Sequence, residues 1–162
     1  MSNFEPIDSM IAKLPDGSLI DTNELEQQVL KICHYVKHVA FYLKDGKSPV
    51  AVIFPNRSLF TNPDYVKSPE EGCFCPRNLP EIGKCLTGCM HSLNDKLPAT
   101  SSKLDAAVII NTELSVTDGT LNPAGNVMPK NILKKYKNHL ENLYGAQLLV
   151  NEEAFEMRLC ND

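Results

Sequence analysis

Four cysteines in the middle of the chain form the densest group of residues that could bind a metal ion. Cys73 and Cys75 are separated by one residue, and Cys85 and Cys89 follow with a spacing of four. Two cysteines four positions apart lie on the same side of a helix, and a Cys-x-Cys pair in the preceding loop can complete a tetrahedron around one ion. The pattern predicts a structural zinc site formed by these four residues, with nearby His91 as an alternative ligand.

The same cysteines have two interpretations that need no metal. Cys85 and Cys89 share a predicted helical face with large apolar residues, and free cysteine is among the most often buried residue types. In that case Cys73 and Cys75 are ordinary loop residues. The third interpretation is redox sensing or a reversible disulfide, which requires a thiol with a lowered pKa.

The remaining candidates for catalysis are sparse. His34 and His38 are four residues apart, but a helix is expected to end between them, so they do not form a metal-binding pair. No serine, threonine or cysteine can be matched with a base and an orienting acid, which leaves a hydrolase without support. Neither Gly-x-x-x-x-Gly-Lys-Ser/Thr nor Gly-x-Gly-x-x-Gly occurs, so the sequence contains no recognisable phosphate-binding loop.

Lysines cluster near the C-terminal end. The last predicted helix begins near Pro129 and contains Lys130, Lys134, Lys135 and Lys137. Such a cluster can be a solvated helix face. It can also be a docking surface for an acidic partner, or for the phosphates of a nucleotide or CoA, because the start of a helix favours an anion.

The composition restricts the class of protein that carries these residues. The chain has 162 residues, of which 43% are hydrophobic and 22% are charged, and its net charge is −4. These values are typical of a globular domain, and the negative charge argues against a general nucleic-acid binder. No apolar run is long enough to span a membrane, and the first six residues lack a signal-peptide pattern. We therefore expect a cytoplasmic protein whose cysteines are reduced.

Turn signals and apolar periodicity predict an α+β fold, a small sheet of short strands with helices packed on it. A turn at Pro15-Asp16-Gly17 joins two short strands, and Asp45-Gly46 joins two longer ones. The other expected elements are a helix over 23–34, strands over 36–43 and 49–54, a helix over 79–97, a strand over 106–110 and a helix from Pro129 to a stop at Gly145. We expect one domain over 1–145, with a Cys-containing segment at 72–91, and a C-terminal tail over 146–162 that packs as a short strand or helix.

Three stretches carry a family resemblance. Residues 13–26 read as strand, glycine turn, strand and helix, residues 38–55 read as a hairpin that ends in an apolar strand and proline, and residues 116–124 with 130–144 read as a loop and last helix. In this order they resemble the C-terminal lobe of the AMP-forming, or adenylate-forming, acyl-CoA synthetases, which include the long-chain fatty-acid–CoA ligases. The resemblance extends over about residues 10–145.

The resemblance implies a fold and an ancestry in carboxylate activation, but this chain departs from the family at two positions. The family uses a lysine in the terminal loop to stabilise charge that develops during adenylation. Here that position holds Asn126, and Lys130 could substitute only through a rearranged loop. The family's hinge aspartate corresponds to Met10, or to Asp8 after a shift. The large lobe, which holds the ATP and acyl pockets, has no counterpart in the sequence.

These observations lead to three hypotheses about function. The first is a stand-alone, non-catalytic relative of the C-terminal lobe that docks to an adenylating lobe, an acyl carrier protein or a second copy of itself, with residues 118–130 as the contact surface. The second is part of an ATP-dependent acyl-CoA ligase of fatty acid metabolism, which would use ATP and CoA only when completed by its large lobe. The third is a zinc-stabilised interaction domain.

Overall fold

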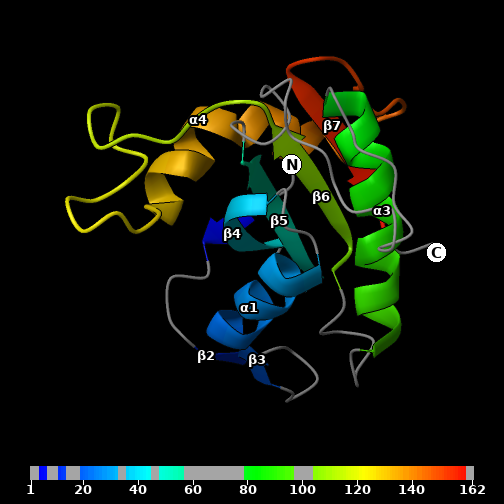
Figure 1. Ribbon diagram of the computed structural model, residues 1–162, viewed down its shortest axis with the longest axis horizontal. Helices are drawn as coiled ribbons and strands as arrows, with labels where there is room; N and C mark the ends of the chain where they lie inside the picture. Colours follow the sequence, from blue (N-terminus) through cyan, green and yellow to red (C-terminus); the bar gives the residue numbers. More distant parts are fainter. Residues whose placement is uncertain are drawn as a thin grey trace, which may run out of the picture.

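The computed structural model describes residues 4–6, 11–13, 19–32, 36–44, 48–56, 79–96 and 104–159. The elements, in chain order, are strands β1 (Phe4–Pro6), β2 (Ile11–Lys13) and β3 (Leu19–Asp21), helix α1 (Thr22–Ile32), strands β4 (Val36–Lys44) and β5 (Ser48–Pro55), helix α3 (Leu79–Lys96), strand β6 (Ala106–Ile110), helix α4 (Pro129–Asn142) and strand β7 (Ala154–Arg158) (Figure 1).

Most strands join one mixed sheet. Its five strands have the order β1-β4-β5-β6-β7, and β2 pairs with β3 in a separate two-stranded sheet. β5 and β6 are parallel, whereas the other neighbours in the large sheet are antiparallel. A parallel pair needs a long crossover, and the connection that contains α3 provides it. The predicted α+β class is confirmed.

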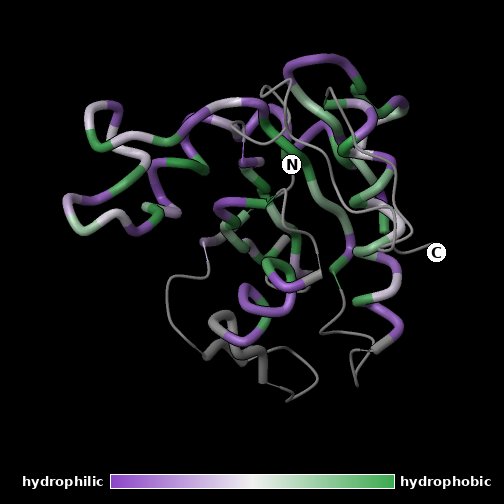
Figure 2. The backbone as a smooth tube through the Cα atoms, in the orientation of Figure 1, coloured by the Kyte–Doolittle hydropathy of each residue, from purple (hydrophilic) through white to green (hydrophobic). Residues whose placement is uncertain are grey.

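Helices cover both faces of the large sheet. Successive residues of a strand point to opposite faces, so each central strand contributes side chains to two cores. Ala51 and Ile53 of β5 belong to the core beneath α1 and α3, whereas Val50 and Val52 belong to the core beneath α4. β6 is buried along its whole length, and Figure 2 shows its largely hydrophobic course. This double coverage explains why the central strands read as continuous apolar runs.

The position of α4 is fixed by its first residue. Pro129 occupies the start of the helix, where a missing N–H costs nothing. Its carbonyl oxygen accepts a hydrogen bond from the hydroxyl of Tyr42 on β4 at 2.8 Å. Burial raises the pKa of Tyr42 above its ordinary value, so the hydroxyl stays protonated and remains a donor. The helix ends at Asn142, three residues before the predicted stop at Gly145.

The segment 146–162, which we expected to be a C-terminal tail that packs as a short strand or helix, contributes a strand. It contains β7, which pairs along its length with β6 and forms one side of the sheet. Phe155, Met157 and Leu159 are buried in the core beneath α1 and α3. Phe155, Met157 and Leu159 alternate with Glu156 and Arg158, which is the pattern of a strand, but the segment is too short for periodicity alone to distinguish a strand from a helix.

Several predictions fall on residues outside the described ones. Two of them are the turns at Pro15-Asp16-Gly17 and Asp45-Gly46. The two strands that flank each turn do form an antiparallel pair, as predicted. Cys73, Cys75 and the two candidate hinge positions, Asp8 and Met10, also lie outside the described residues.

Candidate functional site

The most elaborate polar structure lies between β6 and α4. Residues 111–128, here called the β6–α4 loop, project away from the sheet in two turns (Figure 1). Turn residues explain this shape, because Gly119 and Gly125 adopt φ angles of +80° and +86°, which other residues rarely tolerate. The loop therefore has a conformation that its sequence encodes locally.

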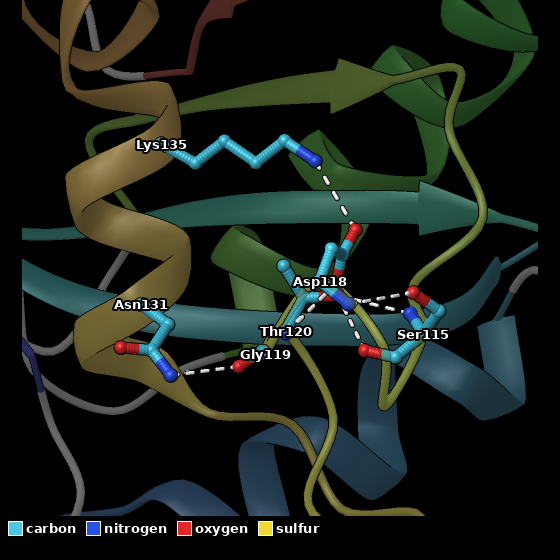
Figure 3. A network of polar contacts seen from close by, with 6 residues as sticks. All are labelled: Ser115, Asp118, Gly119, Thr120, Asn131 and Lys135. Carbon is cyan, nitrogen blue, oxygen red and sulfur yellow. Dashed lines mark hydrogen bonds and ion pairs between the residues drawn. The ribbon is translucent and has the colours of Figure 1, made fainter.

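Asp118 organises the first turn (Figure 3). Its Oδ1 accepts hydrogen bonds from the N–H of Thr120 at 2.9 Å and from the hydroxyl of Thr120 at 2.5 Å. The same hydroxyl oxygen accepts the N–H of Ser115 at 3.0 Å, and the N–H of Asp118 donates to Oγ of Ser115 at 3.2 Å. Thr120 is almost fully buried, so these bonds close the turn around a shielded centre.

Two residues of α4 attach this turn to the helix. Nδ2 of Asn131 donates to the carbonyl oxygen of Gly119 at 2.7 Å, and Nζ of Lys135 lies 3.2 Å from Oδ2 of Asp118 (Figure 3). The bonds from Thr120, and then the smaller effect of Lys135, hold the pKa of Asp118 well below its ordinary value. The carboxylate is therefore ionised at neutral pH, and its bond to Lys135 in turn raises the pKa of the lysine.

The second turn carries Asn126, the residue that the family resemblance predicts at the position of the family's lysine. Oδ1 of Asn122 accepts the N–H groups of Ala124 and Asn126 at 2.9 and 3.0 Å. Leu121 and Val127 form an isolated antiparallel bridge across the base of the turn, so residues 121–127 make a small hairpin. Asn126 is exposed on this hairpin.

The structure places the predicted lysines along α4 beside the loop. Lys130, Lys134, Lys135 and Lys137 are all exposed. Lys134 and Lys135 line an open hollow of about 380 Å³ together with Asp118 and Asn131. The sequence indicated the lysines and the Asp118-Gly119 turn but missed Ser115, Thr120 and Asn131, whose roles depend on contacts across the loop.

A much smaller cavity lies where β5 and β6 end, near the start of the loop. It encloses about 50 Å³ and is lined in part by Lys37, His38, Thr112 and Glu113. Burial, and then the charge of Lys37, lowers the pKa of His38, which keeps its imidazole neutral at physiological pH. This volume accommodates one or two water molecules.

A separate buried cluster fastens the C-terminal end of α4 to β7. The side chain of Glu156 is fully buried. It accepts hydrogen bonds from Nδ2 of Asn142 at 2.5 Å and the N–H of Leu149 at 2.9 Å, and it lies 3.0 Å from Nδ1 of His139. Three partners compensate for burying a carboxylate, so we assign this cluster a structural role.

The predicted zinc site is only partly within the described structure. Cys85 and Cys89 are half-buried on α3 and do not form a disulfide, and Cys89 packs against the core beneath α1 and α3. Cys73 and Cys75 lie outside the described residues. Within the described part of the chain, no three histidine, cysteine or acidic side chains gather around one point. The zinc site therefore stays a prediction.

Comparisons with known proteins identify the fold. No protein-family model and no curated protein matches the chain. A solved adenylation–PCP didomain of carboxylic acid reductase from Segniliparus rugosus, in complex with AMP, matches 84% of this chain with a TM-score of 0.60 and 15% identity. The adenylation domain of a carboxylate reductase from Mycobacterium chelonae matches 83% with a TM-score of 0.58 and 17% identity.

These matches show a shared fold. The chain spans only 17% and 19% of the two matched chains, about a fifth of their length. The predicted resemblance to AMP-forming enzymes is confirmed at the level of the fold, whereas the assignment to their C-terminal lobe stays a prediction. Among the described residues, no helix is long and apolar enough to span a membrane.

Proposed function

We propose that these 162 residues form a relative of the C-terminal lobe of the adenylate-forming enzymes that docks to a partner and does not catalyse adenylation by itself. The observation that carries this proposal is an ordered loop with a neutral residue at the position that the resemblance assigns to the family's lysine. The β6–α4 loop is held in shape by a network of hydrogen bonds, yet its family lysine position holds the neutral, exposed Asn126.

The chemistry of adenylation explains why this residue matters. Attack of a carboxylate on the α-phosphate of ATP develops negative charge, which a fixed cation stabilises. The amide of Asn126 carries no charge. Lys130 lies in the first turn of α4. Between the hairpin and this turn, the N–H of Met128 donates a hydrogen bond to the carbonyl oxygen of Thr120 at 2.9 Å. This bond would break if Lys130 moved onto the hairpin, so Lys130 is a poor substitute for the lysine.

The same loop is well suited to docking. A loop that is already ordered loses little conformational entropy when a partner binds it. The lysines of α4 beside the loop add a basic surface that attracts acidic groups. One of the similar structures joins an adenylation domain to a PCP domain and contains AMP, which makes an adenylating lobe or an acyl carrier protein the partner that we propose.

Affinity capture tests the docking role directly. The full chain serves as bait in a lysate of its source cells, and a second bait carries Ala124→Asp, which introduces a negative charge beside the basic surface at an exposed position of the hairpin. We expect the first bait to recover a protein with an AMP-forming large lobe or an acyl carrier protein, and the second bait to recover less of it. Recovery of neither class, or equal recovery by both baits, contradicts the proposal.

Pyrophosphate exchange on the recovered pair tests the catalytic part. We expect little acid-dependent exchange with Asn126 and a gain of about tenfold or more with Asn126→Lys, since one well-placed charge stabilises such a transition state by a few kcal/mol. Ala124→Lys places the same charge two residues away and should give no gain. Full exchange with Asn126 would instead make the chain a working part of an AMP-forming ligase.

A further inference from the structure

A short extended segment lies on the outer side of β7 and widens the sheet. Val150 forms an isolated antiparallel bridge with Phe155. On either side of this bridge, the N–H of Glu156 donates to the carbonyl oxygen of Leu149, and the N–H of Asn151 donates to that of Ala154, both at 2.9 Å. Residues 148–150 therefore form the last edge of the sheet, beyond β7 in Figure 1.

Among the described residues, no strand pairs with the outer side of this edge. In an antiparallel pair, a residue flanked by two such bonds directs its own N–H and C=O away from the neighbouring strand. Val150 is in that position, and no backbone group of the described residues bonds to it. Its side chain is 50% exposed and that of Leu149 is 40% exposed. An exposed apolar edge with outward backbone groups is a template for another strand.

The charge pattern restricts what that strand can be. Residues 142–151 contain no charged side chain, although 22% of the whole chain is charged, and Glu141 and Glu152 mark the two ends of this run. Beside the edge lies an open hollow of about 530 Å³, lined by Asn142, Gln147 and residues 148–150. Interface centres are depleted in charge, and here an uncharged apolar edge lies next to a space that can receive side chains.

We propose that this edge pairs with the same edge of a second copy of the chain, antiparallel around a two-fold axis at Val150. The two valines would then exchange both backbone hydrogen bonds. In this register Leu149 of one copy lies opposite Asn151 of the other, and Glu152 and Glu153 lie in the turn to β7, beyond the paired residues. No like charges oppose one another, so the edge is compatible with itself.

The geometry favours a closed dimer. A two-fold interface uses the same surface on both copies and leaves neither free for a third. The opposite edge of the sheet, β1, ends in Pro6, which has no N–H to donate. The β6–α4 loop and the edge at residues 148–150 lie on opposite sides of the view in Figure 1, and dimerisation does not depend on the docking role proposed above.

Sedimentation equilibrium of the full chain over a range of concentrations tests the dimer. We expect a monomer–dimer equilibrium that strengthens with added salt, because each copy has a net charge of −4 and salt screens their repulsion. Val150→Lys should raise the dissociation constant at least about tenfold, since it places two lysines opposite each other at the axis. Val116→Lys is the matched control, because Val116 is 53% exposed on the β6–α4 loop and should leave the constant unchanged.

A second substitution distinguishes charge repulsion between the two copies from an effect on folding. Val150→Glu introduces the opposite charge and should weaken the dimer in the same way, and circular dichroism confirms that the variants retain the fold. A chain that stays monomeric at all concentrations overturns the proposal. So does a dimer that resists both changes at Val150, a dimer that Val116→Lys weakens equally, or an assembly that grows beyond two copies.

Discussion

Asp118 shows how one exposed carboxylate can order a long loop. Its two oxygens bind different elements: one accepts hydrogen bonds within the β6–α4 loop and the other contacts Lys135 on α4. Both oxygens are needed, because one closes the turn and the other attaches it to the helix. The position of the hairpin that carries Asn126 therefore depends on Asp118, which lies in the other turn of the same loop.

The pH dependence of stability can test this role of Asp118. Its folded-state pKa is lowered from an ordinary value of 3.8, so the ionised carboxylate stabilises the folded state above about pH 3.8. This contribution is lost as the pH falls from 3.8 through the folded-state pKa. We expect Asp118→Asn to lower the urea midpoint at pH 7 and the difference from the wild type to shrink at pH 3 and below.

Glu141→Gln is the control for this measurement. Glu141 is an exposed carboxylate on α4 whose side chain makes no hydrogen bond among the described residues. Its substitution should change the urea midpoint little at either pH. A midpoint difference for Asp118→Asn that stays constant between pH 7 and pH 3 would show that the charge of Asp118 is not what stabilises the loop.

At the scale of elements, the contact between α3 and β7 is unusually close. A Cβ atom added to Gly83 would lie 2.2 to 2.5 Å from three ring atoms of Phe155. The ring is buried in the core beneath α1 and α3, so it has little room to move. Gly83 is therefore required by packing, although glycine is a poor helix former.

Two alanine substitutions on the same helix should have opposite effects. Gly83→Ala should destabilise the protein by about 1–3 kcal/mol, because overpacking outweighs the gain in helix propensity. Gly88→Ala should stabilise it by up to about 1 kcal/mol, because nothing lies within 4 Å of an added Cβ there. Urea unfolding of both variants measures the difference, and a stabilised Gly83→Ala would show that Phe155 does not pack against this residue.

How far the sequence predicted these elements depended on their length and coverage. β4, β5, α3 and β6 were predicted within about one residue, because turn residues or prolines bound them and their apolar patterns are long. β1 was not predicted, because a strand of three residues has no clear periodicity, and β7 was left as a strand or a helix, because its five residues are too few to distinguish the two. The burial of Glu156 in β7 could not be predicted, because its partners His139, Asn142 and Leu149 come from other parts of the chain.

The candidate site was predicted in outline only. Asp118-Gly119 indicated a turn, and the correspondence of Asn126 to the family's lysine stays a prediction of the resemblance. The hydrogen bonds of Ser115, Thr120 and Asn131 depend on backbone positions in the two turns and the helix that no periodic pattern encodes.

At the scale of the whole molecule, two surfaces differ in their chemistry. The loop and the exposed lysines of α4 form a basic region on a protein whose net charge is −4, whereas the edge beyond β7 is uncharged and apolar. Strand β7 supports that edge and closes both cores. The C-terminal segment therefore determines both the stability of the sheet and the surface proposed for dimerisation.

Removal of residues 146–162 should consequently abolish the fold. The loss of Phe155, Met157 and Leu159 removes three large side chains from the core, and burial of each stabilises a protein by about 1.5–3 kcal/mol. The sum, about 5–9 kcal/mol, is comparable with the whole stability of a typical domain, which is about 5–15 kcal/mol. We expect the chain 1–145 to lose its cooperative thermal transition in circular dichroism and to bind the hydrophobic dye ANS, whereas full-length Val150→Lys should retain the transition because that side chain is half-exposed. A cooperative transition in the chain 1–145 would show that β1, β4, β5 and β6 form a stable sheet without β7.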